Sequence, residues 1–471
     1  MLRLVLVVQG GQLYWPDERR YTQVLDIFDL HRGHWFDLIK ALVSTQEHLG
    51  FALFSAIPAS IQLATGHALS RSGGGVMLLP GILLSQMSVV NIALIYAVAR
   101  RAGRDRAEAL LAAALMASAT TMFYYARHLL PYDSAMLLAL VALWYGIGTS
   151  PRDSFACGMA ASAAFLVYNG YWLIAGVVLL LHLVQDGRTA RSAVARAVYA
   201  AIGCVAVPAV ILVIQLATGA PLLISGMRRL AGTVTDGYAP EGFSVPWPYF
   251  WHAEHGLLLL WLVSALFVAL GSGAWNTARR RTAMKWVVAA VVIYCGLGVT
   301  SAMLHWFVVM GRQSRQLVPF FSLATAAAIA ELRDRRRWSR VVVAAGVVLL
   351  TLQVGWNFRQ PLQQRFPQDV IAEIRSEYGD VDLETTIEGP PDPQEHVESR
   401  WVLFNAEHLY HPRAPRPPLP PSAVEVVRYR HPLQFLPYQY EGFAPMERQL
   451  LRANDIAMRL VDVGAPVDRL P

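Results

Sequence analysis

Two adjacent carboxylates, Asp17 and Glu18, follow the apolar start of the chain within residues 15–21, whose one-letter sequence is WPDERRY. A carboxylate partly withdrawn from water can take a proton from a hydroxyl group or hold a divalent cation. The same residues would also suit the first turn of an interfacial helix, where proline is tolerated and acidic side chains favour the helix dipole. Asp17 and Glu18 are therefore candidate catalytic residues, with a helix N-terminus as the structural alternative.

A third carboxylate, Asp133, stands close to Arg127 and His128, just before an apolar run that begins at Ala135. Its structural interpretation is a helix N-cap. The catalytic interpretation requires this segment to lie next to Asp17, where the two aspartates would also be candidate ligands of a metal ion. We take Asp133 as a candidate catalytic residue, and Arg127 and His128 as candidate ligands of an anionic group.

Arg312 and Arg315 lie directly before another apolar run, within residues 311–319 (GRQSRQLVP). The planar fork of N–H donors on arginine binds phosphate, and at the level of lipid headgroups the natural anion is a lipid phosphate or diphosphate. Snorkelling of both side chains to the membrane interface is the alternative. The sequence thus offers an acid–base group and a phosphate-binding group, each beside an apolar run.

The composition predicts the elements that must position these groups. Of the 471 residues, 55% are hydrophobic and only 15% are charged, and the mean hydropathy is +0.37. An average soluble domain has roughly 25% charged residues, so disorder, collagen and an ordinary soluble enzyme are excluded.

The net charge of +7 does not predict nucleic-acid binding, because most arginines before the tail lie in short joints between apolar runs. Cys157, Cys204 and Cys295 are far apart within apolar runs, and this spacing suggests neither disulfides nor a zinc site.

We expect an all-α polytopic membrane protein with about eleven spans, at residues 2–14, 76–99, 107–125, 135–148, 155–167, 171–184, 197–217, 256–273, 286–309, 316–330 and 341–356. Runs of 13 to 15 residues reach only about 20 Å, so several spans are expected to be broken, extended or surrounded by a thinner bilayer.

Arginine and lysine fix the predicted orientation. With the N-terminus cytoplasmic, the inner joints carry 17 Lys and Arg in 46 residues, whereas the outer segments carry 10 in 119. The positive-inside rule selects this orientation, so the chain is predicted to cross the cytoplasmic (inner) membrane many times, with an extracytoplasmic C-terminus. The first outer loop, residues 14–75, then contains the moderately apolar segment 48–66, which we interpret as an interfacial or re-entrant helix rather than a span.

The chain is predicted to have two domains, a transmembrane domain at residues 1–356 and an extracytoplasmic domain at 357–471. The second contains 12 Arg, no Lys and six prolines within residues 411–421. Alternating apolar residues predict strands at 401–404 and 424–429, and helical spacing predicts a helix at 447–461. We expect a small α+β domain without a recognisable catalytic motif.

The order of these features resembles the membrane glycosyltransferases of the C superfamily. The resemblance rests on the apolar N-terminal run, the motif at 16–21 (PDERRY), the long outer loop, the Arg-rich inner joint and Asp133. It is strongest toward the branch of protein O-mannosyltransferases and lipid A aminoarabinose transferases, where an arginine-to-proline motif at a late span is similar to residues 315–319 (RQLVP). It covers about residues 1–356, and its first motif is the most specific.

This resemblance implies transfer of a sugar from a polyprenyl-phosphate carrier to a hydroxyl group at the outer membrane face, by a single inverting displacement. The acceptor would be a glycan such as lipopolysaccharide, a lipid or a protein. Asp17 matches the family's acidic residue that contacts the acceptor or a metal, Glu18 is its neighbour, and Asp133 matches the second outer carboxylate. Arg315 would hold the carrier phosphate as it leaves. A divalent metal is the one cofactor to test, with Asp17 and Asp133 as candidate ligands.

Two other classes of function stay open. The chain could be a transporter or flippase of lipid-linked glycans, in which the outer charges guide a headgroup and no bond is made. An ion-coupled transporter usually keeps ionisable groups at the membrane midplane, and the predicted spans are nearly free of them. It could also be an inactive scaffold that binds partners through its tail. The sugar and the acceptor are not specified by these residues.

Overall fold

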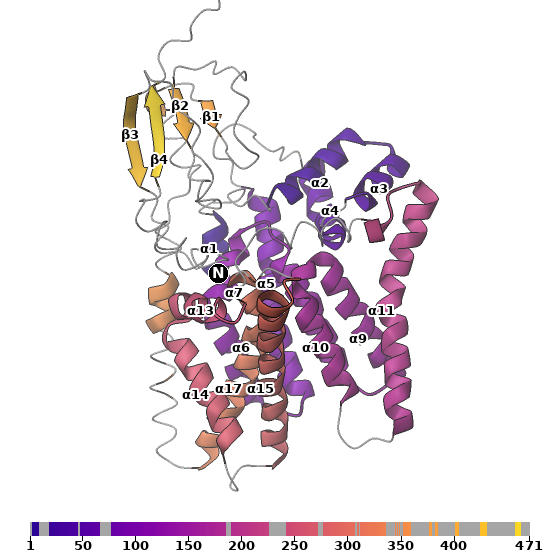
Figure 1. Cartoon of the computed structure of the whole chain (residues 1–471), viewed down its shortest axis with the longest axis vertical. Coiled ribbons are helices and arrows are strands. Elements are labelled where there is room, and N and C mark those ends of the chain that lie inside the picture. The colour runs from indigo at the N-terminus through magenta and orange to yellow at the C-terminus, as the bar shows by residue number, and fades with distance from the viewer. Residues whose placement is uncertain are drawn as a thin grey trace, which may run out of the picture.

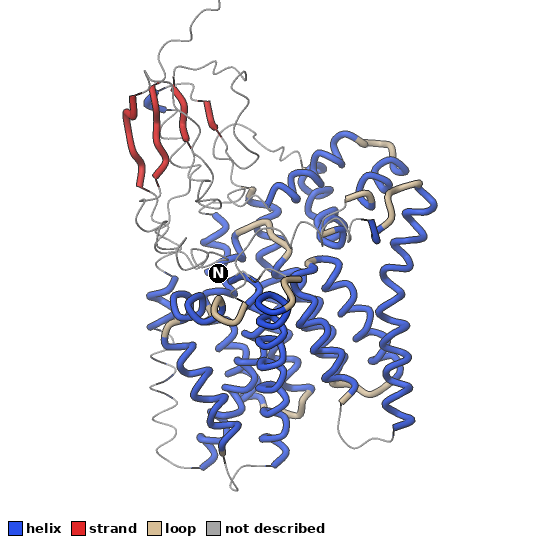
Figure 2. The backbone as a smooth tube through the Cα atoms, viewed as in Figure 1, coloured by secondary structure: helices blue, strands red, loops and turns tan. Residues whose placement is uncertain are grey.

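The computed structural model describes residues 2–8, 18–45, 48–65, 77–184, 190–225, 242–271, 277–306, 309, 311–335, 344, 346, 348, 352–358, 376–378, 382–384, 401–404, 424–430 and 457–462. Most of these residues are helical (Figures 1 and 2). The helices are α1 (Leu2–Val8), α2 (Arg19–Leu30), α3 (Trp35–Val43), α4 (Leu49–Ala64), α5 (Leu78–Arg101), α6 (Arg106–Ser118), α7 (Thr120–Phe123), α8 (Tyr132–Gly146), α9 (Pro151–Val167), α10 (Trp172–Leu183), α11 (Ala190–Thr218), α13 (Pro246–Glu254), α14 (Gly256–Leu270), α15 (Thr277–Gly298), α16 (Gly311–Ser314) and α17 (Val318–Arg335). Short helical turns at Tyr124–Arg127 (η2), Asn169–Tyr171 (η3), Val299–Met303 (η4) and Arg315–Leu317 (η5) extend or join them.

Three helices of the described chain are long and apolar enough to cross a membrane, namely Leu78–Arg101, Ser192–Thr218 and Ala278–Met303. They have 24, 27 and 26 residues. At about 1.5 Å per residue, each exceeds the roughly 30 Å of a hydrocarbon core. A membrane protein is thus supported by length and composition, at three of the predicted positions. The count of eleven spans stays a prediction.

A fourth candidate span is broken. Taken together, Arg106–Ser118 and Thr120–Arg127 are long and apolar enough to cross a membrane, but their axes differ by 74°. The break falls at Ala119, whose backbone is extended (φ −68°, ψ 120°). Four further apolar helices, at Leu49–Ala64, Tyr132–Gly146, Asn169–Leu183 and Gly256–Leu270, are shorter than a full span. The short runs predicted at 135–148 and 171–184 thus form helices shorter than a full span, whereas the break falls in the longer run predicted at 107–125.

Two segments near the chain's start, the predicted span 2–14 and the predicted interfacial segment 48–66, do not form a straight crossing helix in the described chain. In the predicted span at 2–14, the described helix α1 has only seven residues, about 10 Å, and residues 9–14 lie outside the described chain. The segment 48–66 forms α4, which Figure 1 shows nearly end-on above the upright helices, together with α2 and α3. A helix lying across the bundle end agrees with the interfacial interpretation. We call the end of the bundle at which α2, α3 and α4 lie the upper end, as drawn in Figure 1.

Helices α9 and α11 pack closely because glycine removes the side chains between them. A β-carbon on Gly158 would lie 2.0 Å from the carbonyl oxygen of Ala200, and one on Gly203 would lie 2.1 Å from that of Phe155. Small residues at such contacts let membrane helices gain van der Waals contact between their backbones. Alanines give the central core the same character, since Ala112, Ala139 and Ala164 are completely buried in it.

The opposite, lower end of the bundle is held by side-chain caps and ion pairs. The Asp105 carboxylate accepts the Glu108 N–H at the start of α6, and Ser150 and Asp153 form a capping box at the start of α9. Arg279 joins α15 to α6 and α17, since its guanidinium lies 3.1 Å from the Glu108 carboxylate and 3.2 Å from that of Glu331. Residues of the predicted joints 100–106, 275–285 and 331–340 therefore meet at this end.

The C-terminal part contains four short strands, β1 (Asp382–Glu384), β2 (Trp401–Phe404), β3 (Val424–Arg430) and β4 (Ala457–Asp462), in the order β1-β2-β4-β3. β1 and β2 are parallel, whereas β4 is antiparallel to both of its neighbours. The predicted strands at 401–404 and 424–429 are found. The predicted helix at 447–461 is wrong at residues 457–461, because backbone pairing with two neighbouring strands overrides the helical spacing. A separate α+β domain stays a prediction.

The contact between α9 and α11 yields a stability prediction. Gly158→Ala should lower the free energy of unfolding by about 1–3 kcal/mol, because its methyl group can fit only if the two backbones separate. Gly176→Ala is the matched control, since Gly176 is an exposed helical glycine with no atom within 4 Å of an added β-carbon. That change should be neutral or stabilise by up to about 1 kcal/mol. Unfolding of the purified protein with SDS measures both, and equal effects would contradict the packing.

Candidate active site

A buried ion pair joins two of the three charged points singled out in the sequence. Asp133 lies in the first turn of α8, and Arg315 begins η5, just before α17. Nη2 of Arg315 donates to Oδ1 of Asp133 at 2.5 Å. The Arg315 side chain is fully buried and that of Asp133 is 8% exposed. Removal of two charges from water is costly, so the pair is stable only where further groups compensate it.

Arg315 retains donor capacity that the described chain does not use. Its Nε and Nη1 atoms are buried, and neither has a hydrogen-bond partner among the described residues. The hydroxyl of the adjacent Ser314 and that of Ser134, next to Asp133, are likewise buried without a partner there. A buried unsatisfied donor costs roughly 1–3 kcal/mol, and more when it is charged. Such donors suit a ligand with several oxygen acceptors.

Tyrosine rings enclose this guanidinium. Its central carbon lies 5.0 Å from the ring centre of Tyr125 and 5.9 Å from that of Tyr132. Edge-to-face contacts continue the row from Tyr132 to Tyr168 at 4.9 Å and from Tyr168 to Tyr171 at 5.1 Å. Cation–π attraction and the apolar rings strengthen electrostatic interactions at Arg315 by keeping water away.

The charge on Arg315 is maintained against burial. Burial alone lowers its pKa, but the neighbouring Tyr171, the Asp133 carboxylate and Tyr249 outweigh this effect, so the net pKa is raised. The guanidinium therefore stays protonated at every physiological pH. Arg3, from α1, also interacts electrostatically with Asp133 and Arg315, and its Nε donates to the Ser88 hydroxyl at 2.7 Å. Sequence analysis did not single out Arg3.

Glu18 brings the first outer segment to the same end of the bundle. It precedes α2, is fully buried, and its Oε1 accepts the backbone N–H of Leu129 at 2.7 Å. The same oxygen lies 3.4 Å from Nδ1 of His128. Asn91 binds the other side of this loop, since its Nδ2 donates to the carbonyl oxygen of Asp133 at 3.0 Å. Asp17 itself lies outside the described residues.

The remaining predicted residues also lie at this end. Arg127 is fully buried in η2, and the His128 ring is 5.4 Å from that of Tyr124. The guanidinium of Arg312 is 5.7 Å from the ring centre of Tyr132. The structure therefore gathers Glu18, Arg127, His128, Asp133, Arg312 and Arg315 at one end of the bundle.

A further carboxylate, Glu254 at the end of α13, was missed. Its oxygens accept the backbone N–H groups of Thr120 and Thr121 at 2.8 Å each and the Thr121 hydroxyl at 2.7 Å. It thereby satisfies free N–H groups at the start of α7, beyond the break at Ala119. Glu254 is the one acidic residue between positions 242 and 271 and directly precedes an apolar run, the same signal that marked Asp133.

The described residues do not fit a metal site. They contain no group of three His, Cys, Asp or Glu side chains close enough to hold a metal ion. Asp133, one of the two candidate ligands, already accepts from Arg315, and Asp17 lies outside the described residues.

Comparison with known proteins does not assign the chain to a family. No family model matches it, and no curated protein matches its sequence. The assignment of function therefore rests on the residues and their geometry.

Glu254 yields a prediction on pH dependence. Burial raises its pKa from 4.5 to about 7, although bonds from Thr121 and Thr120 and the charge of Arg315 oppose this. Between these values the folded state holds a proton that the unfolded state has released, so stability falls as pH rises. The contribution is fully present below pH 4.5 and lost as pH rises through about 7. The loss is at most about 3 kcal/mol.

SDS unfolding of the wild type and of Glu254→Gln between pH 4 and 8 measures this contribution. The neutral amide cannot titrate, so the fall in unfolding free energy over this range should be smaller in the variant by up to about 3 kcal/mol. Identical pH profiles would show that Glu254 does not titrate in this window.

Proposed function

We propose that this protein is a membrane glycosyltransferase that uses a lipid-linked sugar. The donor is a sugar on a polyprenyl-phosphate carrier, and the acceptor is a hydroxyl group of a glycan, a lipid or a protein. Transfer takes place at the upper end of the bundle, which faces the outside of the cytoplasmic membrane. The similarity of the outer motifs to the C superfamily supports this proposal alongside the geometry.

The single observation that carries the proposal is the buried guanidinium of Arg315. It is held on one side by Asp133, and two of its nitrogens have no acceptor in the described chain. A sugar phosphodiester provides acceptor oxygens and one negative charge, which the protonated guanidinium balances. Tyrosines around it keep water away and offer flat apolar faces. A simple snorkelling arginine would instead direct its nitrogens to water.

The proposed reaction is a single displacement at the anomeric carbon. The acceptor oxygen forms a bond to this carbon while the bond from the carbon to the phosphate oxygen breaks, which inverts the configuration. The acceptor proton passes to a carboxylate, and the electron pair of the broken bond leaves on polyprenyl phosphate, now with a second negative charge. Arg315 stabilises that additional charge, which exists only as the bond breaks.

The carboxylates have different proposed roles. Asp133 fixes the position of Arg315, since its oxygen is engaged by Nη2. Glu18 positions the loop that leads to Asp133, since its oxygen is engaged by the Leu129 N–H. Asp17, by its match to the family motif, is the proposed base for the acceptor hydroxyl. Arg127 and Arg312 add positive charge around the path of the donor phosphate, and His128 adds a polar ring nitrogen.

The finer topology is part of the proposal. Eleven spans with a cytoplasmic N-terminus would place all Arg-rich joints on one side. In support, side chains of four such joints pair at the lower end: Arg101 with Asp153 at 2.6 Å, and Arg279 with Asp105 and Asp334. The C-terminal residues 357–471 would form an extracytoplasmic α+β domain, for which the four strands are the described support.

Transfer assays test the proposed activity. Purified wild-type protein should transfer sugar from at least one of a panel of radiolabelled polyprenyl-phosphate sugars to an acceptor in membrane extract. Arg315→Gln should reduce the rate at least about a hundredfold, because stabilisation of the leaving phosphate is lost. Arg315→Lys should retain more activity than Arg315→Gln. Asp17→Asn should abolish transfer and keep donor binding.

Arg333→Gln is the matched control. It also removes an arginine ion pair, with Asp105 and Asp334 at the lower end, and should leave the transfer rate unchanged. The flippase alternative predicts a different pattern, with donor translocation across liposomes that persists in Asp17→Asn and no transfer by any protein. A scaffold would show neither activity. Either pattern would overturn the proposed reaction.

A further inference from the structure

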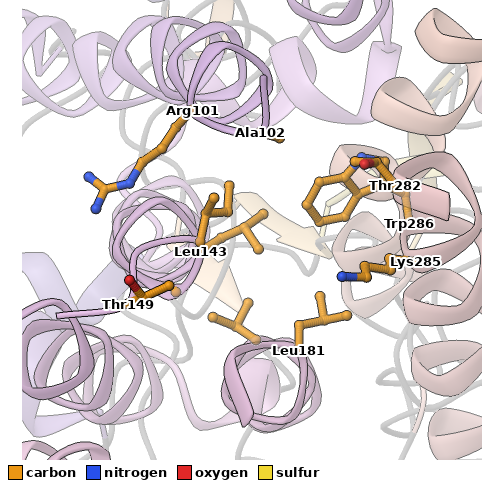
Figure 3. Close-up of a pocket in the computed structure, with 11 residues that line it drawn as sticks. Arg101, Ala102, Leu143, Thr149, Leu181, Thr282, Lys285 and Trp286 are labelled. Atoms are coloured by element: carbon orange, nitrogen blue, oxygen red, sulfur yellow. The ribbon is translucent and has the colours of Figure 1, made fainter. Parts of the chain in front are cut away.

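A second cavity lies at the lower end of the bundle, away from the Asp133–Arg315 pair. It has a volume of about 280 Å³ and lies between the ends of α5, α8 and α10 and the early turns of α15 (Figure 3). Its walls are mainly apolar and are formed by Leu143, Ile147, Val178, Leu181 and Trp286. Ligand pockets are typically about 300–1,000 Å³, so this space suits one end of an elongated molecule.

The polar groups of the cavity are cationic or hydroxylic. Lys285, Arg101, Thr149 and Thr282 all line it. Figure 3 shows the Lys285 side chain directed toward Leu143 and Leu181, across the cavity, whereas the Arg101 guanidinium points away from them. Lys285 is thus the cation that faces the space, and an ammonium group beside apolar walls favours a ligand with an anionic group on an apolar body.

Arg101 differs from Lys285 in the direction of its side chain, which points away from the cavity toward its own contacts. Its Nη2 lies 2.6 Å from the carboxylate of Asp153, and its guanidinium stacks 3.9 Å from the ring centre of Trp144. The charge of Arg101 is therefore balanced by a neighbouring carboxylate. Arg101 forms part of the rim, and Lys285 is the cation placed to meet a ligand, because its side chain is directed across the cavity.

The surface around the cavity is suited to contact with acyl chains. Leu180 on α10, Val184 directly after α10 and Val288 on α15 are about half exposed, within a few residues of lining positions Leu181 and Lys285. Exposed aliphatic side chains on helices of this kind are expected where a protein meets lipid. An apolar tail leaving the cavity therefore meets an apolar surface.

We propose that this cavity binds an anionic phospholipid of the leaflet at the lower end. The phosphate lies at Lys285, with Thr149 and Thr282 as hydroxyl donors, and the first acyl carbons lie against Leu143 and Leu181. The remainder of the lipid stays in the bilayer. Anionic lipids are concentrated in the cytoplasmic leaflet, where basic side chains attract them. The site is separate from the sugar-transfer site, and the proposal does not depend on the proposed enzyme activity.

Native mass spectrometry of the purified, delipidated full-length protein tests the proposal. The probes are phosphatidylglycerol and phosphatidylcholine with the same acyl chains. Wild-type protein should bind the first phosphatidylglycerol molecule at least about fivefold more tightly than phosphatidylcholine, and Lys285→Met should remove this preference, as expected for one charge near a membrane surface. Lys285→Arg should restore it. Leu181→Trp, which fills the cavity without a change in charge, should also weaken phosphatidylglycerol binding.

Arg281→Met is the matched control, because Arg281 is an exposed cation one helical turn before Lys285 and does not line the cavity. It should bind phosphatidylglycerol like the wild type. Glycerol 1-phosphate, which lacks acyl chains, should not compete. The proposal is overturned if Lys285→Met keeps the preference, if Arg281→Met loses it equally, or if glycerol 1-phosphate competes as well as the lipid.

Discussion

The ion pair between Asp133 and Arg315 is the constraint on which the upper end of this bundle depends. It joins positions 182 residues apart, one at the start of α8 and the other just before α17. Loss of one partner from a buried pair typically costs about 3–5 kcal/mol, because the other charge is left uncompensated in the interior. The start of α8 and the start of η5 must therefore stay together. The tyrosines, Asn91 and Glu18 around them lower the free-energy cost of burying the two charges.

The two ends of the bundle use charge in different ways. At the lower end, Arg279 and Arg333 contact several carboxylates that are partly exposed. Each such ion pair alone contributes little to the stability of the fold, so the network mainly aligns the helix ends. At the upper end, Asp133 and Arg315 are buried, and donor groups there lack partners in the described chain. The lower network is satisfied by its own residues and is structural, whereas the spare donors of the buried upper network are the groups that the proposed function assigns to the donor phosphate.

The sequence supported correct predictions where the signal was local. Long apolar runs predicted α5, most of α11 and most of α15. Charged residues beside apolar runs marked Asp133 and Arg315 separately as candidates, and their roles stay predictions. Their mutual contact could not be predicted, because spacing along a chain does not show which helix ends meet. Glu254 carried the same local signal and was overlooked among the aromatic residues of α13. The helix expected at 447–461 was wrong at residues 457–461, because strand pairing depends on partners far away in sequence.

The break at Ala119 explains how side chains far apart in the sequence come together around Arg315. A straight continuation of α6 would carry residues 120–127 further along its axis, whereas the 74° bend turns Tyr125 toward Arg315 and leaves Arg127 buried. Glu254 stabilises the bend, and its carboxylate also interacts with the charge of Arg315. Around this arginine, Arg3 adds positive charge, Asp133 adds negative charge, and Glu254, with a pKa of about 7, is only partly ionised at neutral pH. The sum of these charges and that of Arg315 is positive, so the electrostatic potential at Arg315 would attract the phosphate of the proposed donor.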